Sequence, residues 1–214
     1  MTRVLCIMGW VTPNEPDTDY RADFLTRPLY TRAEVFSTPC PVPRSPGVYG
    51  WWFRTIPGPI GVSGCQHRGG LTLLYAGISP TRPPTNGKPP SSQNLHQRIR
   101  YHYSGNGEGS TLRKTLGVLL ADELGIELRR VGSGKRRTFG KHGEAVLTNW
   151  MADNALVSWL VHSEPLVLER ELIETLDVPL NLQDNKHNAF HAELTRLRAT
   201  AERNARDKPV LGER

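Results

Sequence analysis

Two short apolar stretches, GVYGWWF at residues 47–53 and LTLLYAGI at residues 71–78, decide the fold of this chain. Both are rich in β-branched and aromatic residues and are bounded by glycine or proline, which is typical of strands. They predict a hairpin with a long connection. Side-chain direction repeats every second residue along a strand, so Tyr49 and Tyr75 are expected side by side on one face of this hairpin.

Length and composition limit the classes of protein that fit. The 214 residues suffice for one moderate domain with its own core. Lysine and arginine outnumber aspartate and glutamate by 27 to 21, and the formal net charge of +6 favours a polyanionic partner. Three widely spaced cysteines without a CxxC pair indicate neither a disulfide scaffold nor a zinc ribbon, so we expect a reduced, cytoplasmic protein. No apolar run has the length of a membrane span, and no membrane partner is expected.

Proline and glycine divide the chain into segments. We expect residues 1–46 to form an irregular arm, residues 47–187 the main domain, and residues 188–214 a C-terminal helix packed on that domain. The stretch NALVSWLVH, at residues 154–162, is apolar on both faces and predicts a central strand.

Residues 95–103 (LHQRIRYHY) predict a helix, because apolar residues recur at every fourth position. Arg98 and His102 are four residues apart, so their head groups share one rim of the buried face. Arg100 flanks the opposite rim. These basic residues either serve a site or are solvated at the edge of a core helix. The glycine-rich turn that follows ends at Ser110, which is expected to cap the next helix.

One acidic residue occupies an unusual position in the stretch LVLERELIETL, at residues 166–176. On a helix Glu169 falls in the middle of the apolar arc, whereas Glu171 and Glu174 fall on the polar side. An ionised carboxylate among leucines costs several kcal/mol unless it is compensated. Glu169 therefore needs either a basic partner, such as Arg98, or a metal ion.

A basic run lies between residues 129 and 141, where six lysines or arginines occur without an acidic residue. Such a run is either a solvated turn or a surface that binds phosphates and releases counterions from a duplex. The expected nucleic-acid contacts are Arg100, Arg129, Arg130, Lys135, Arg136, Arg137 and Lys141.

Five motifs occur in a fixed order between residues 47 and 181: G-V-Y, Y-A-G, L-x-x-R-x-x-x-H, L-E-x-x-L-I and P-L-N. In this order they resemble the GIY-YIG nuclease superfamily. The resemblance implies an α/β sandwich in which a small three-stranded antiparallel sheet is flanked by helices. Residues 54–70 and 104–153 are longer than in minimal members of this superfamily and are expected to be insertions.

The resemblance also implies roles for individual residues. Tyr49 and Tyr75 match the signature tyrosines, and Glu169 matches the glutamate that binds the metal, Mg²⁺ or Mn²⁺. The catalytic set that it implies is Tyr49, Tyr75, Arg98, His102, Glu169 and Asn181.

Phosphodiester hydrolysis needs an in-line water, a base, neutralisation of the phosphate and help for the leaving oxygen. A tyrosine is the expected base, although moving its pKa from near 10 to near 7 takes roughly 4 kcal/mol of preferential phenolate stabilisation. Tyr49 is the first choice, and Tyr75 would orient the water or the phosphate. Arg98 would clamp the phosphate. His102 would assist either proton transfer or phosphate binding.

These observations predict a divalent-metal-dependent endonuclease that acts on double-stranded DNA, of restriction or defence type. A homodimer would provide two active sites for two strands. Three alternatives stay open. They are a non-catalytic DNA-binding module on the same fold, a structure-specific or RNA-directed nuclease, and a small-molecule enzyme that uses the same cleft.

Overall fold

The computed structural model of the protein describes residues 19–83, 89 and 91–212. Residues 1–18 of the expected arm lie outside the described residues. Along the described chain the elements are α1 (Tyr20–Thr26), α2 (Arg32–Val35), β1 (Gly47–Phe53), β2 (His67–Arg68), β3 (Leu71–Ser79), α3 (Leu95–Ser104), α4 (Thr111–Leu119), α5 (Ala121–Leu124), β4 (Arg129–Val131), β5 (Arg136–Thr138), α6 (Gly140–Asn154), β6 (Ala155–Val161), α7 (Pro165–Thr175) and α8 (His191–Asp207).

The main sheet is antiparallel and has four strands in the order β2-β3-β1-β6. The α/β class and the antiparallel sheet are confirmed, but the expected number of three strands is wrong. The additional strand is the short β2, which pairs with the start of β3 and lies in the segment expected to be the long connection of the hairpin. It is short because it ends at Gly69 and Gly70, whose positive φ angles depart from the strand conformation.

Strand β6 is an edge strand of this sheet, and the expectation of a central position is wrong. Its residues are apolar on both faces because helices cover both faces of the sheet, not because strands flank it on both sides. The outer edge of β6 is partly closed by Tyr30, whose backbone N–H and C=O both bond to Val157 at 2.9 Å. This contact satisfies backbone groups that an edge strand would otherwise expose.

The register of β1 and β3 places the two signature tyrosines on one face. Tyr49 lies opposite Gly77, and Tyr75 lies opposite Trp51, with a register shift after Trp51. Tyr49 and Tyr75 are therefore diagonal neighbours, as the alternation along the two stretches predicted.

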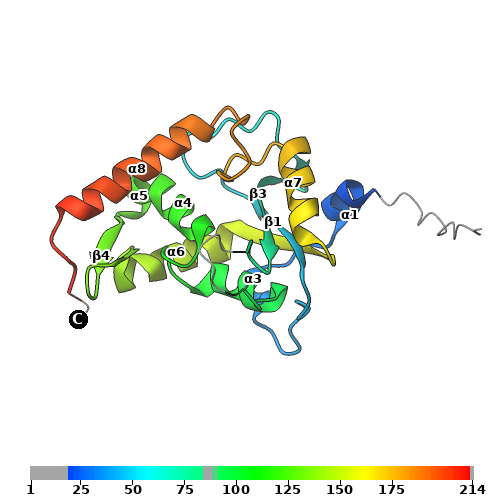
Figure 1. Ribbon diagram of the computed structural model, residues 1–214, viewed down its shortest axis with the longest axis horizontal. Coiled ribbons are helices and arrows are strands. Elements are labelled where there is room, and N and C mark those ends of the chain that lie inside the picture. Colours follow the sequence, from blue (N-terminus) through cyan, green and yellow to red (C-terminus); the bar gives the residue numbers. More distant parts are fainter. Residues whose placement is uncertain (1–18, 84–88, 90, 213–214) are drawn as a thin grey trace, which may run out of the picture.

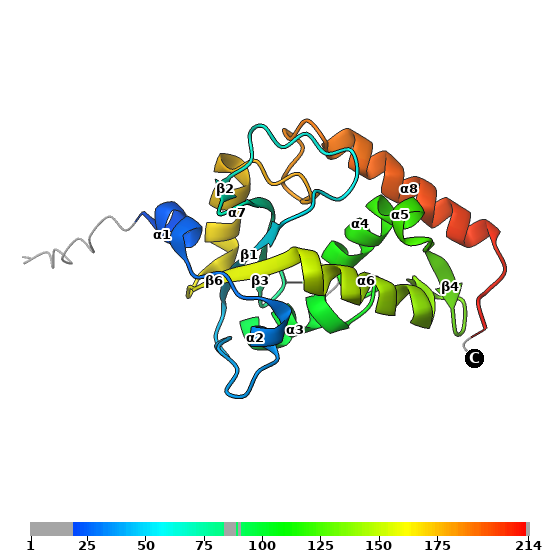
Figure 2. The same cartoon turned by 180° about the vertical axis from the view of Figure 1, so that it is seen from behind.

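Two apolar cores cover the two faces of the sheet. One core packs Tyr49, Trp51 and Phe53 against α3, α4 and α6. The other packs Val48 and Trp52 against α1 and α7. Figures 1 and 2 show α1 and α7 at one end of the molecule and α4, α6 and α8 at the other. The two tyrosines thus lie on the face that α3 covers.

The remaining elements extend the end of the molecule that carries α8. Helix α8 contacts α4 and β4, and β4 pairs with β5 in a separate hairpin. Figure 1 shows this hairpin beside the end of α8 and away from α7. No helix in the described ranges is long and apolar enough to cross a membrane.

Candidate active site

Tyr49, Tyr75 and His102 form one buried cluster on the face of the sheet that α3 covers. The Oη atom of Tyr49 lies 2.8 Å from Nε2 of His102. The ring of Tyr75 meets the same imidazole edge-on, with the ring centroids 6.4 Å apart. His102 is 0% exposed, so both of its ring nitrogens must find partners inside the protein.

Arg98, one turn before His102, also contacts Tyr49. Its Nε donates to Tyr49 Oη at 3.4 Å, and its Nη1 donates to the backbone carbonyl of Gly109 at 3.2 Å. A guanidinium carries five N–H groups. The two contacts therefore orient the side chain and leave further donors for a phosphate.

The surroundings keep both phenols and the imidazole neutral in this state. Burial raises the pKa of Tyr49, while the charge of Arg98 lowers it. Burial also raises the pKa of Tyr75, and the negative charge of Glu169 adds to this effect. Burial, together with the charges of Arg98 and Arg113, holds the pKa of His102 well below its usual range. A phenolate therefore needs positive charge beyond that of Arg98.

The loop between α3 and α4 orients both functional residues of α3. Asn106 closes this loop, because its Oδ1 accepts the backbone N–H groups of Glu108 and Gly109 at 3.1 Å each. The loop then delivers the Gly109 carbonyl to Arg98 and the Ser110 hydroxyl to His102, with Ser110 Oγ 2.7 Å from Nδ1. The segment expected to be an insertion therefore supports the site directly.

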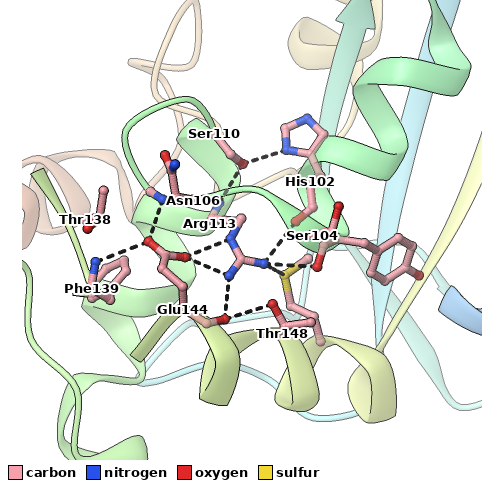
Figure 3. A network of polar contacts seen from close by, with 12 residues as sticks. His102, Ser104, Asn106, Ser110, Arg113, Thr138, Phe139, Glu144 and Thr148 are labelled. Carbon is pink, nitrogen blue, oxygen red and sulfur yellow. Dashed lines mark hydrogen bonds and ion pairs between the residues drawn. The ribbon is translucent and has the colours of Figure 1, made fainter. Parts of the chain in front are cut away.

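A buried ion pair anchors this loop to the rest of the fold (Figure 3). Arg113 is 0% exposed, and its Nε and Nη2 both donate to Glu144 Oε2, at 3.0 and 2.7 Å. Its Nη1 donates to the backbone carbonyls of His102 and Tyr103 at the end of α3. Glu144 Oε1 accepts the N–H of Gly107 at 2.8 Å, so α3, the loop, α4 and α6 form one rigid unit.

Glu169 on α7 is 7% exposed, and its charge is compensated by Arg82. Nε and Nη2 of Arg82 donate to Glu169 Oε2 at 3.1 and 2.7 Å, and Nη1 bonds to Asp184. The sequence predicted that Glu169 needs either a basic partner, such as Arg98, or a metal ion. A basic partner is present, and it is Arg82 rather than Arg98. Burial raises the pKa of Glu169, and Arg82 opposes this shift.

The position of the Arg82 guanidinium shows where a cation fits. It lies between the carboxylates of Glu169 and Asp184 and stands in for a positive ion there. Within the described ranges no group of three or more metal-ligating side chains occurs. Mg²⁺ keeps several of its waters and needs only one or two carboxylates. The donor set thus suits such an ion, provided that Arg82 withdraws.

Asn181 orders the strand that carries Tyr75. Its Nδ2 donates to the backbone carbonyl of Ala76 at 2.7 Å, and its Oδ1 accepts the Ala76 N–H at 2.9 Å. Asn181 is 5% exposed and uses both the nitrogen and the oxygen of its amide for these two bonds. It therefore holds β3 between Tyr75 and Gly77.

Four residues near the cluster could not be assigned to it from the sequence. Arg82 lies in a proline-rich stretch without periodicity, and Ser110 was recognisable only as a helix cap. Gly77 belongs to the Y-A-G tripeptide, where a glycine two residues after a signature tyrosine was the available signal. Arg198 on α8 donates to Thr115 Oγ1 at 3.2 Å, and its charge acts on Tyr75 from far along the chain.

Several residues of the expected nucleic-acid surface hold the fold together. Arg129 donates to the Pro209 carbonyl at 3.0 Å, and Arg130 donates to the Ala205 and Lys208 carbonyls at 3.2 and 2.8 Å. These bonds satisfy carbonyls at the end of α8, where helix C-termini favour cations.

The other residues of the expected nucleic-acid surface differ in whether they bond within the fold or are exposed. Arg100 donates to the Val35 carbonyl at 3.0 Å and lies over the Phe36 ring at 4.1 Å. Arg137 lies 3.9 Å from the carboxylate of Glu202. The remaining members, which are exposed at the surface, are Lys135, Arg136 and Lys141.

Comparison with protein families agrees with this geometry. The family model described as the GIY-YIG catalytic domain matches residues 47–200. The chain belongs to this family, whose function is of nuclease type. Searches of curated proteins and of solved structures found no match. The matched range contains β1, β3, α3, α7 and the first half of α8, and thus every member of the cluster.

Proposed function

We propose that this protein is a divalent-metal-dependent endonuclease that hydrolyses phosphodiester bonds of double-stranded DNA in restriction or defence. One observation carries the proposal: Arg98 Nε donates to the hydroxyl oxygen of Tyr49 at 3.4 Å, and His102 Nε2 lies 2.8 Å from the same oxygen. Donors that converge on a phenolic oxygen stabilise the phenolate, which is the form that acts as a base.

In the proposed reaction Tyr49 accepts a proton from the attacking water. Arg98 donates its remaining N–H groups to the non-bridging oxygens of the phosphate, where its planar fork matches the geometry. Tyr75 orients the water or the phosphate. His102 is sealed from solvent and has partners on both nitrogens, which favours an interaction with Tyr49 over direct phosphate binding.

Glu169 is the proposed ligand of Mg²⁺ or Mn²⁺, with Asp184 beside it. A bound ion would supply positive charge next to the scissile phosphate. Glu169 and Asp184 would hold that charge in place, and their present partner Arg82 would then be free to contact the DNA backbone. Asn181 keeps β3 in register with these groups.

The proposal is tested with supercoiled plasmid, Mg²⁺ and a chelator control. Glu169→Gln is expected to remove metal-dependent nicking, whereas Glu171→Gln on the same helix is expected to retain it. Circular dichroism and thermal unfolding are used to check that both variants fold. Equal nicking by the two variants excludes Glu169 as the metal ligand, and no nicking by the wild-type protein contradicts the proposed activity.

Three measurements distinguish the finer parts of the proposal. Cleavage of RNA with inert DNA would contradict the assignment of DNA as substrate. Sedimentation with a duplex of defined length tests whether a homodimer forms on the substrate. Lys135→Ala and Lys141→Ala are expected to reduce the salt dependence of DNA binding by about one ion each, if each lysine neutralises one phosphate.

A further inference from the structure

Ser110 has a role beyond capping α4. Its Oγ accepts the backbone N–H of Arg113 at 3.1 Å, which is the capping bond, and it lies 2.7 Å from His102 Nδ1. Both side chains are 0% exposed. Figure 3 shows the hydroxyl of Ser110 directed at the imidazole.

The hydrogens of this pair can be assigned by counting donors and acceptors. A neutral imidazole carries one N–H and one bare nitrogen, and a serine hydroxyl has one hydrogen to donate. If Nδ1 carried the hydrogen, Ser110 Oγ would accept two N–H groups, and its own hydrogen would lack an acceptor among its contacts in the described ranges. A buried donor without a partner is costly. The opposite tautomer instead leaves the phenolic hydrogen of Tyr49 without an acceptor among its contacts in the described ranges, because Tyr49 Oη then accepts from both Arg98 and His102. Tyr49 gives up that hydrogen when it acts as the base, whereas Ser110 keeps its own, so the count favours a bare Nδ1 in the reactive state.

We infer that the Ser110 hydroxyl donates to Nδ1 and thereby places the imidazole hydrogen on Nε2, where it points at Tyr49. Ser110 is thus a positioning residue for the proposed base. This inference rests on the proposed function of Tyr49, but the tautomer that it assigns can be measured without activity.

The charged and titratable groups around His102 support the same tautomer. Arg98 on its own helix, Arg113 on α4, Tyr49 on β1 and Tyr75 on β3 surround the imidazole. Two of these groups are cations, and none is a carboxylate. A relay in which His102 takes the Tyr49 proton would create an imidazolium beside two guanidinium groups in a buried site. A hydrogen bond donated from Nε2 to Tyr49 avoids that charge.

The two tautomers have opposite effects on Tyr49. An Nε2–H group donates to the phenolic oxygen and stabilises the phenolate, together with Arg98. A bare Nε2 accepts the phenolic hydrogen and stabilises the neutral phenol instead. Loss of the Ser110 hydroxyl should therefore raise the apparent pKa of the base.

Long-range ¹⁵N NMR of the full chain, with labelled histidine, reads the tautomer directly. His102→Gln assigns its signals. The wild-type protein is expected to show a bare Nδ1 and a protonated Nε2, and Ser110→Ala to show the reverse. Ser110→Thr, which keeps the hydroxyl, is expected to restore the wild-type pattern. Ser104→Ala removes an exposed hydroxyl that bonds to the Arg100 carbonyl and serves as the control.

The pH profile of single-turnover cleavage gives a second readout. For Ser110→Ala we expect the apparent pKa of the base to rise by about one unit. This rise lowers the rate at neutral pH about tenfold and lets the rate recover at higher pH. A merely structural role would lower the rate equally at all pH values. Ser110→Gly removes the same hydroxyl but retains most of the capping preference, so it replaces the alanine variant if that one fails to fold.

The outcomes separate the inference from the proposed function. A protonated Nδ1 in the wild-type protein, or an unchanged tautomer in folded Ser110→Ala and Ser110→Gly, overturns the role of Ser110. Absence of cleavage by a wild-type protein that shows the expected tautomer overturns the proposed function and leaves the tautomer assignment supported.

Discussion

Tyr49 and Gly77 lie opposite each other on β1 and β3, and the Tyr49 side chain occupies the space above Gly77. A Cβ atom at residue 77 would lie 2.6 Å from Tyr49 Oη and 2.8 Å from Cζ. The absent side chain of Gly77 therefore allows the Tyr49 hydroxyl to reach His102. This relationship connects the two signature tripeptides of the family across the hairpin.

We expect Gly77→Ala to displace the Tyr49 ring and to break its bond to His102. Overpacking of this kind costs about 1–3 kcal/mol of the free energy of unfolding. The cleavage rate should fall by more than the loss of stability explains, because the displaced hydroxyl is the proposed base. Urea unfolding and single-turnover cleavage measure the two effects. Gly61→Ala is the matched control, since a Cβ at residue 61 meets nothing within 4 Å.

The two tyrosines should differ in their contribution to the rate. Tyr49→Phe removes the proposed base and is expected to lower single-turnover cleavage by about 10²–10⁴-fold. Tyr75→Phe removes the hydroxyl that is proposed to orient the water or the phosphate, and it is expected to lower the rate about tenfold or less. The opposite ranking would transfer the role of base to Tyr75.

Arg82 should compete with a divalent ion for Glu169. Removal of a charged hydrogen-bonding partner changes a binding free energy by about 1.5–3 kcal/mol. We therefore expect Arg82→Gln to bind Mn²⁺ at least tenfold more tightly, as measured by titration calorimetry or by the loss of the free Mn²⁺ electron spin resonance signal. Arg170→Gln is the control, because Arg170 is exposed and lies 3.9 Å from Asp184. Unchanged or weaker Mn²⁺ binding by Arg82→Gln would place the ion elsewhere.

The neutral state of His102 makes stability depend on pH. Its pKa in the folded protein lies well below the ordinary value of 6.5, so the unfolded chain takes up the proton first as the pH falls. The contribution of neutral His102 is complete above about pH 6.5 and is lost progressively below it, by up to about 1.4 kcal/mol per pH unit.

Urea unfolding between about pH 7.5 and about pH 5 measures this dependence, from about one unit above to about 1.5 units below the ordinary histidine pKa. His102→Gln is expected to flatten the dependence, because glutamine does not titrate. His142→Gln replaces an exposed histidine at the start of α6 and should retain the wild-type slope. An equal slope in His102→Gln would show that other groups cause the dependence.

Local patterns in the sequence were sufficient for the hairpin, for helix α3 and for the placement of Glu169. Alternation in GVYGWWF and LTLLYAGI placed Tyr49 and Tyr75 on one face, because side-chain direction in a strand depends only on position along the chain. Helical periodicity likewise identified Glu169 as a carboxylate in an apolar arc that needs a cationic partner. These inferences succeeded because each rests on neighbours within a few residues.

The partners of those residues were decided by the tertiary structure alone. Arg82 meets Glu169 across a separation of 87 residues, and Asn181 meets Ala76 across 105. The fourth strand and the edge position of β6 also depend on contacts between distant segments. A sequence specifies which side chain needs a partner, through its charge and its burial. Which partner it receives depends on how the chain closes its loops, and no local pattern contains that information.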